Sequence, residues 1–449
     1  METYKIELIS RRKFLIVAIV GTTAIAAAPK TFLSTRKRHN VLFIMADDLG
    51  YGDLSNFGRP DYHTPHLDRL ANQGVRFTNA YAAAPLCTPT RCAFITGRYP
   101  ARLPIGLKEP LEFGDNSVGL LPDHPTIASL LKDEGYETAL VGKWHLGYLP
   151  EYGPNQHGFN EFFGILSGGV DYFTHKDALG KLDLYENLEP VERNGYITDL
   201  LTERAVDFIS RRRDRPFYLS LHYTAPHWPW EGPGDEQVSR SLKNFGDGGS
   251  LKVFAAMMKS LDDGVGRVMK ALSDAKLDRD TLIIFTSDNG GERFSYNWPL
   301  SRQKGTLWEG GLRVPAIVRW KGVVPAGHYT EQAAITMDWA STILSATQTK
   351  PEVNYPFDGE DLLPICKGER AIYDRTLFWR TSKQDAGRSG KWKYLKGSKT
   401  EHLFDLSNDP GEKVELKETY PDILARLRTE FQKWESQMLP RPLEGHVEE

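Results

Sequence analysis

The chain has 449 residues, more than a single hydrophobic core usually holds, which predicts one large domain with a smaller one beside it. Its 56 Lys and Arg residues against 59 Asp and Glu residues give a formal net charge of -3, which argues against a nucleic-acid-binding protein. A hydrophobic share of 40%, with 27 Pro and 40 Gly, is typical of a loop-rich globular protein and excludes a repeat array.

The N-terminus has the layout of an export signal. Ser10-Arg11-Arg12-Lys13 precedes a short apolar run, and a tract of small residues ends at Ala28. This order predicts a signal peptide over residues 1–28, and the paired arginines resemble a twin-arginine signal. The apolar run is shorter than the ~20 residues of a spanning helix, so we expect no stable membrane span. We expect the twin-arginine machinery to export the protein to a bacterial periplasm or to the medium.

Four apolar runs of strand length each lead to polar residues. The runs cover 40–46, 138–142, 216–221 and 281–287, and the residues that follow are Asp47-Asp48, Lys143-Trp144-His145, Ala225-Pro226-His227 and Asp288-Asn289. Helical patterns separate the runs, so we predict an α/β fold with a large, mostly parallel sheet flanked by helices. Ligands bind at the carboxyl ends of strands in such sheets, which places these polar residues where chemistry usually happens.

The last quarter of the chain has a different sequence pattern. A glycine-rich loop with Lys304 and Glu309-Gly310-Gly311 precedes a further strand, and short polar segments follow Asp358-Gly359. A final amphipathic helix carries Leu424, Leu427 and Phe431 on one face. We predict a catalytic domain over 38–365, a small C-terminal α+β subdomain over 366–440 and a charged tail over 441–449.

Two pairs of oxygen-bearing side chains are candidate metal ligands. Asp47, Asp48, Asp288 and Asn289 offer only oxygen, which suits Ca²⁺ or Mg²⁺ better than Zn²⁺. Each pair alone would more often cap a helix or begin a turn. Two pairs at the ends of predicted buried strands favour a metal site.

The basic residues are weaker candidates for the functional site when each is considered alone. Lys143 and His145 are two residues apart and would face the same side if strand geometry persists, so that one could neutralise an anion while the other exchanges protons. Histidines at strand ends are more often structural, and the same applies to His227 beside Pro226. Lys304 is by default a surface charge, and we treat Arg313 as part of a structural ion pair.

The segment from Cys87 to Arg98 reads Cys-Thr-Pro-Thr-Arg and closes on Thr-Gly-Arg. Its residue pattern is too specific for an ordinary turn, and the segment is too polar for a buried core. It resembles the signature of the sulfatase family, in particular of the formylglycine-dependent arylsulfatase and N-acetylgalactosamine-6-sulfatase-like members. Further matches occur in the family's order: Asp47-Asp48, Gly142-Lys143-Trp144-His145, Pro226-His227, Ser287-Asp288-Asn289-Gly290, Lys304 with Glu309-Gly310-Gly311, and Leu403-Phe404-Asp405-Leu406. Thr90 stands where many members have serine, but it keeps the hydroxyl.

The resemblance implies an alkaline-phosphatase-like sandwich and a modified cysteine. A maturation enzyme would oxidise Cys87 to formylglycine (3-oxoalanine), whose hydrate attacks sulfur. One Ca²⁺, or Mg²⁺ in its place, would be held by Asp47, Asp48, Asp288 and Asn289 together with the oxygen at position 87.

The family also implies a role for each remaining residue. Arg91 would hold the formylglycine in place, and Lys143 and Lys304 would stabilise charge on the sulfate. His227 would donate a proton to the leaving alcohol, and His145 would deprotonate the remaining hydroxyl so that sulfate is expelled.

The other two cysteines form no disulfide framework. If Cys87 is modified, one bridge between Cys92 and Cys366 remains possible, but we expect buried, unpaired thiols instead.

The substrate is a weaker inference. Export and a group of aromatic residues that could stack on sugars favour a sulfated polysaccharide or oligosaccharide over a simple aryl sulfate; these residues are Tyr172, Trp228, Trp230, Trp298 and Trp308. Any one of them alone is more often core packing. A phosphate mono- or diester hydrolase of the same superfamily would more often show a second metal cluster, and a non-catalytic carbohydrate-binding protein would be expected to lose Lys143, His145 or the metal carboxylates.

Overall fold

The computed structural model describes residues 38–239 and 244–442. The predicted signal peptide and most of the predicted tail lie outside the described residues. Among the helices of the described ranges, none has the length and apolar character needed to cross a bilayer.

One large mixed sheet organises the main part of the chain. Its order is β10 (His328–Thr330), β2 (Val75–Tyr81), β9 (Arg313–Arg319), β8 (Thr281–Ser287), β1 (Asn40–Ala46), β7 (Phe217–His222), β3 (Glu137–Lys143), β4 (Glu161–Ile165), β5 (Tyr185–Glu186) and β6 (Glu189–Pro190), with β11 (Ala334–Ile335) paired to β2. The four predicted strands are the neighbours β8, β1, β7 and β3, which all run parallel, with Met45 opposite both Thr286 and His222. Their carboxyl ends therefore meet at one edge of the sheet.

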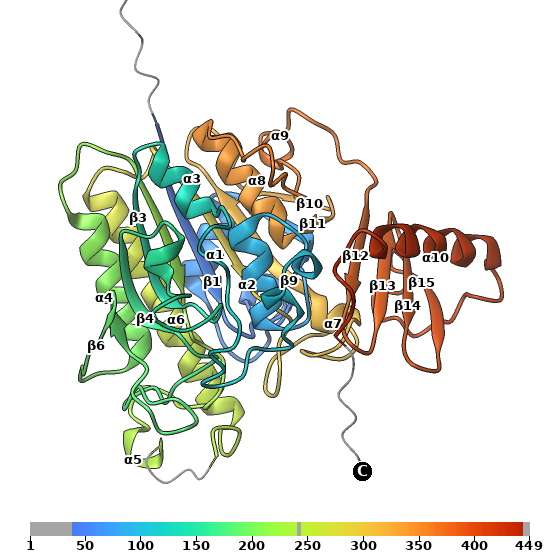
Figure 1. Ribbon diagram of the computed structural model, residues 1–449. Helices are drawn as coiled ribbons and strands as arrows, with labels where there is room; N and C mark the ends of the chain where they lie inside the picture. Colours follow the sequence, from blue (N-terminus) through green and yellow to red (C-terminus); the bar gives the residue numbers. More distant parts are fainter. Residues whose placement is uncertain (1–37, 240–243, 443–449) are drawn as a thin grey trace, which may run out of the picture. The chain divides into compact units, whose positions relative to one another are not determined.

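Helices cover both faces of this sheet, which explains the continuous apolar runs. On one face Val41, Phe43 and Met45 share a core with residues of α2 (Cys87–Thr96), α3 (Ile127–Asp133) and α8 (Thr336–Thr347). On the other face Leu42 and Ile44 share a core with residues of α1 (Pro65–Asn72), α4 (Ile197–Ser210) and α6 (Leu251–Asp274) (Figure 1). Alternate side chains of one strand thus belong to opposite cores.

Short helices complete this part of the chain. They are η1 (Ser55–Phe57), η2 (Pro100–Arg102), η3 (Ile105–Leu107), η4 (Pro154–His157), α5 (Glu236–Ser239), α7 (Glu309–Leu312) and α9 (Leu363–Cys366). Of these, α7 occupies the predicted glycine-rich loop.

The C-terminal sheet is antiparallel and carries one helix. Its strands follow one another as β12 (Thr376–Arg380), β13 (Asp385–Ser389), β14 (Trp392–Lys396) and β15 (Glu401–Asp405). The predicted final helix is α10 (Pro421–Glu435), and its Leu427 and Phe431 share a core with Trp379 and Tyr394 of the sheet. The predicted fold class, a large mostly parallel sheet with helices plus a small α+β subdomain, is confirmed.

The Cys87 segment differs from the expectation that it is too polar to be buried. It forms α2, and all ten residues of this helix are buried. The polar side chains have internal partners: Thr90 Oγ1 donates to Ala84 O at 3.0 Å, Thr96 Oγ1 donates to Cys92 O at 2.7 Å, and Arg91 pairs with Asp288. Burial is tolerated because these groups are satisfied inside the protein.

All three cysteines are buried free thiols. Burial raises the pKa of Cys92 and of Cys366 to about 12, so both remain protonated at neutral pH.

A buried ion cluster joins the two sheets. The Lys393 Nζ of β14 lies 2.9 Å from Glu309 Oε1 and 2.7 Å from Glu412 Oε1, and all three side chains are fully buried. Glu412 Oε2 also accepts a hydrogen bond from the Glu309 amide at 2.7 Å, and Tyr81 Oη donates to Glu309 Oε2 at 2.6 Å. Through Lys393, the C-terminal sheet thereby stabilises the position of α7.

We predict that Lys393→Met destabilises the protein by about 3–5 kcal/mol, because two buried carboxylates lose their counter-charge. Burial raises the pKa of Glu412 to about 7 even with Lys393 present. The defect should therefore shrink as the pH falls and the carboxylates take up protons.

Denaturant unfolding of the wild type, of Lys393→Met and of Lys396→Met, which changes an exposed lysine of the same strand, measures this effect. Equal unfolding free energies for the two variants would show that the cluster does not support the fold.

Candidate active site

The carboxyl ends of the central strands bring together most of the predicted site residues. Lys143, the last residue of β3, donates from Nζ to Oδ2 of Asp47 at 2.7 Å, and Asp47 directly follows β1. Asp288 directly follows β8, and its Oδ1 accepts a hydrogen bond from the Asp48 amide at 3.1 Å. These residues are no more than 3% exposed.

The four predicted metal ligands form one oxygen-rich group. Asn289 Nδ2 donates to Asp48 Oδ1 at 2.8 Å, which leaves the Asn289 amide oxygen buried and without a hydrogen-bond partner. Asp47 Oδ1 also lacks a hydrogen bond, although Arg91 Nη2 lies 3.5 Å away. Buried oxygen atoms with unused lone pairs are what a hard cation requires, so these residues fit Ca²⁺ or Mg²⁺. The ligand atoms of Asp47, Asp48 and His227 also lie within 4.8 Å of one another.

Arg91 connects the ends of β8 and β3. Its Nε and Nη2 donate to Asp288 Oδ2 at 3.1 and 2.7 Å, and its Nη1 donates to the Lys143 carbonyl at 3.1 Å. Burial alone would raise the pKa of Asp288, but the positive charges of Arg91 and then of Lys143 hold this pKa below its ordinary value. Burial and the neighbouring Asp288 instead raise the pKa of Asp47.

Cys87 is the first residue of α2 and is 2% exposed. Arg91 follows four residues later, so both side chains lie on the same face of the helix. Pro89 falls within the first turn, where a missing backbone N–H costs nothing. Burial raises the pKa of the Cys87 thiol, while Lys143 and Lys304 act to lower it. The spacing of the motif thus places the cysteine and the arginine in one charged cluster.

Lys304, from the loop before α7, contacts the same acidic cluster. Its Nζ donates to Asp48 Oδ2 at 2.7 Å, and its side chain is 12% exposed. Burial alone would lower the pKa of Lys304, but Asp48 and then Cys87 raise it, so the lysine stays charged.

The two predicted histidines also lie in this cluster. His227 Nδ1 lies 2.5 Å from the Trp228 carbonyl, and its Nε2 lies 3.7 Å from Asp48 Oδ2. His145 Nε2 lies 2.9 Å from the Leu111 carbonyl, while its Nδ1 is buried without a partner. Burial lowers both pKa values well below the ordinary value, assisted by Lys143 at His145 and by Lys304 at His227. Both rings are therefore neutral at neutral pH.

Lys143 and His145 would face the same side only if the strand continued beyond Lys143. The strand ends at Lys143, and His145 has a left-handed backbone with φ of 57°. The His145 ring reaches the cluster through this turn in the backbone and not through the pleat of a strand.

Two further residues of the site were not identified from the sequence. His222, the last residue of β7, lies 3.1 Å from the Lys143 carbonyl and 3.3 Å from Arg91 Nη1, and burial lowers its pKa to about 3. Its position at the end of an apolar run was the available signal. Glu292 has a buried Oε2 without a hydrogen-bond partner, and burial followed by Asp48 raises its pKa.

The aromatic candidates for sugar stacking separate into two groups. Tyr172 and Trp230 are buried in the core with α4 and α6, and Trp308 packs beside the core of the C-terminal sheet. Trp298 is 66% exposed, and Trp228 is half-buried beside His227, with ring centroids 4.3 Å apart.

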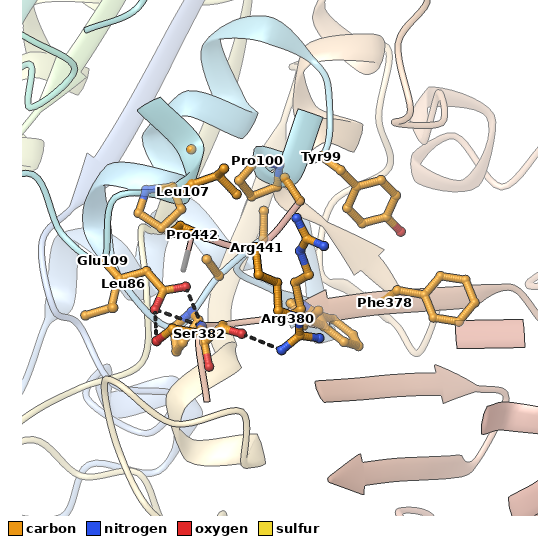
Figure 2. A pocket seen from close by; sticks show the side chains of 18 of the residues that line it. Leu86, Tyr99, Pro100, Leu107, Glu109, Phe378, Arg380, Ser382, Arg441 and Pro442 are labelled. Atoms are coloured by element: carbon orange, nitrogen blue, oxygen red, sulfur yellow. Dashed lines mark hydrogen bonds between the residues drawn. The ribbon is translucent and has the colours of Figure 1, made fainter. Parts of the chain in front are cut away.

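A small cavity adjoins the start of α2 but does not extend the site. Figure 2 shows its lining, in which Leu86, Tyr99 and Pro100 of the main part face Phe378 and Arg380 of the C-terminal sheet. The Glu109 carboxylate accepts hydrogen bonds from Ser382 N and Oγ at 3.0 and 2.9 Å across this joint. The cavity encloses about 20 Å³, which suits a water molecule and not a sugar.

Comparisons with known proteins agree with this arrangement. The family model described as Sulfatase matches residues 39–349. N-acetylgalactosamine-6-sulfatase of Canis lupus familiaris is 30% identical over 96% of this chain and 90% of its own length, and arylsulfatase A of Homo sapiens is 34% identical over 90% and 86%. The crystal structure of Ps i-CgsB in complex with k-i-k-neocarrahexaose has a TM-score of 0.81 and 31% identity over 91% of this chain and 95% of that chain.

A family model that covers most of the chain, relatives aligned over nearly its full length and a shared fold all lead to the same assignment. The chain belongs to the sulfatase family and is a hydrolase of sulfuric esters.

Proposed function

We propose that the protein hydrolyses sulfate esters of a sulfated polysaccharide or oligosaccharide, using formylglycine at position 87 and one bound Ca²⁺. The observation that carries this proposal is the position of Cys87 at the start of α2, inside a buried cluster of two lysines, two histidines, an arginine and four oxygen ligands. Such a cluster binds and polarises a tetrahedral anion.

The two groups absent from the polypeptide sequence supply specific chemistry. Formylglycine provides an aldehyde hydrate whose oxygen attacks sulfur, and a divalent cation provides positive charge for the sulfate oxygens. Asp47, Asp48, Asp288 and Asn289 would hold the cation together with the oxygen at position 87, with Mg²⁺ as an alternative to Ca²⁺.

The basic residues bind the sulfate and fix position 87. Lys143 and Lys304 approach the carboxylates from two sides and would neutralise sulfate oxygens. Arg91 is fully engaged with Asp288 and the Lys143 carbonyl, so it would hold the strand ends and the residue at position 87 in place.

The neutral histidines move protons. His227 is neutral in the free protein and its Nδ1–H faces the Trp228 carbonyl, so Nε2 would first take up the proton that the attacking hydroxyl at position 87 releases and would then donate it to the leaving alcohol. His145 would accept a proton at its unpartnered Nδ1 from the hydroxyl that remains at position 87, so that sulfate is released.

A sulfated carbohydrate is the proposed substrate class. The support is the sulfated-sugar names of relatives, the neocarrahexaose bound to the similar structure, and the two aromatic side chains at positions 228 and 298 that remain outside the core. We further propose export by a twin-arginine signal over residues 1–28, after a maturation enzyme has acted on Cys87.

We predict that Cys87→Ala lowers sulfate release by roughly 10⁴-fold or more, because the nucleophile is lost. The measurement is sulfate release from 4-nitrophenyl sulfate and from a panel of defined sulfated oligosaccharides, with conversion of Cys87 verified by peptide mass. Cys92→Ala, in the same buried helix, is the matched control and should retain activity.

Retained activity in Cys87→Ala would refute the proposed nucleophile. Turnover of aryl sulfates alone would refute the carbohydrate substrate, and faster release of phosphate than of sulfate from matched aryl esters would favour a phosphoesterase.

We predict that the effect of His227→Ala depends on the leaving group. A sugar sulfate releases a poor alkoxide and should lose about 10²–10⁴-fold in kcat, whereas 4-nitrophenolate leaves without a proton and should lose much less. His63→Ala, at an exposed position, should leave both rates unchanged. An equal loss on both substrates would exclude the role of His227 as the proton donor.

We predict that Ca²⁺ raises the Tm of chelator-treated protein, since a ligand that binds only the folded state stabilises it by about 2.7 kcal/mol at 100-fold excess over Kd. Asp48→Asn should weaken this response, and Asp133→Asn, at an exposed position, should not. A wild-type Tm that does not respond to Ca²⁺ or to Mg²⁺ would contradict the cation site.

A further inference from the structure

A basic groove lies between β2 and the C-terminal sheet, and none of the site residues above lines it. Its volume is about 630 Å³, which lies within the range of about 300–1,000 Å³ typical of ligand sites. Basic side chains predominate in its wall: Arg313, Arg375, Arg388 and Lys391 stand against Glu331 and Asp374.

Arg388 of β13 is the unusual member of this wall. The residue is 7% exposed, its Nε donates to the Gly390 carbonyl at 3.1 Å, and its Nη1 is buried without a hydrogen-bond partner. Its guanidinium carbon lies 5.0 Å from the centre of the Tyr81 ring, which fixes the plane of the group. Within the described residues no carboxylate lies within ion-pair distance of Arg388. A nearly buried guanidinium whose Nη1 has no hydrogen-bond partner is suited to bind an anion.

The other cations of the groove have structural partners. Arg375 pairs with both oxygens of Asp338 at 2.6 and 3.1 Å, and Lys391 pairs with Asp405 at 2.7 Å. Arg313, expected to be structural, donates to the Thr78 carbonyl at 2.6 Å and lies 3.7 Å from Glu309. These residues make the wall positive, and Arg388 supplies the free donors.

The groove continues from the elements that build the active site. The Arg313 guanidinium lies 4.9 Å from the centre of the Tyr51 ring, three residues after Asp48. Arg313 also follows α7, whose Gly311 carbonyl accepts the amide of Gly290 next to Asn289. The groove and the active site are thus built on shared elements, namely β9, α7 and the segment that follows β1.

We propose that this groove binds a second sulfate group of the same glycan chain, with the Arg388 guanidinium as its principal hydrogen-bond donor. The proposal rests on the proposed carbohydrate function and adds to it that the substrate carries more than one sulfate. A planar guanidinium fork matches two oxygen atoms of a sulfate ester, as it does those of a phosphate or a carboxylate.

The test compares two substrates and one free anion. For wild type, Arg388→Gln, Arg388→Lys and the control Arg426→Gln, an exposed arginine of α10, kcat/KM is measured on a multiply sulfated neocarrahexaose and on 4-nitrophenyl sulfate. Binding of inorganic sulfate is measured by calorimetry. Thermal unfolding verifies that each variant is folded.

We expect Arg388→Gln to lower the ratio of kcat/KM, hexasaccharide over 4-nitrophenyl sulfate, about tenfold through a higher KM, as loss of one charge-assisted contact predicts. Arg388→Lys should recover part of the ratio, and Arg426→Gln should keep the wild-type ratio. An unchanged ratio would overturn the proposal, and inorganic sulfate bound through Arg388 as tightly as the hexasaccharide would reassign the groove to the free anion. A wild type that hydrolyses 4-nitrophenyl sulfate but no oligosaccharide would instead refute the carbohydrate function and this inference with it.

Discussion

The buried contacts of Arg91 with Asp288 and the Lys143 carbonyl are the constraint on which the site depends. One guanidinium binds the ends of β8 and β3 from a helix that starts at Cys87, so Cys87 and the strand ends are fixed relative to each other. Acidic groups at these strand ends would repel one another without a buried cation between them. The charges that hold the strands together are the same ones that we propose bind a sulfate and a metal ion.

The C-terminal sheet contributes to this geometry from outside the site. Its Lys393 holds Glu309 at the start of α7, and the α7 glycines contact the backbone beside Asn289 and Ser301. Glycine is needed here because a Cβ on Gly310 would lie 2.3 Å from the Arg302 carbonyl. A subdomain that contains none of the proposed metal ligands thereby supports the loop that carries Lys304.

Much of the fold and of the site could be predicted from the sequence, because buried parallel strands are continuous apolar runs and their polar ends must meet at one edge. The burial of α2 could not be predicted, since it depends on partners such as Asp288 that are nearly two hundred residues away. His145 reaches the site through a left-handed residue that strand periodicity cannot show. Glu292 and Arg388 are identified only by a missing partner, which is a property of three-dimensional packing.

The complete burial of α2 also bears on when Cys87 could be modified relative to folding. If Cys87 is oxidised as proposed, the modifying enzyme would have to reach it before α2 is buried, because in the folded chain this helix shares its core with α8, which begins at Thr336. At about 5–20 residues per second, the ribosome needs roughly 10–50 s to synthesise the intervening chain. On this proposal modification would compete with folding during this interval, and the rate at which α8 packs on α2 would limit the fraction of molecules that become active.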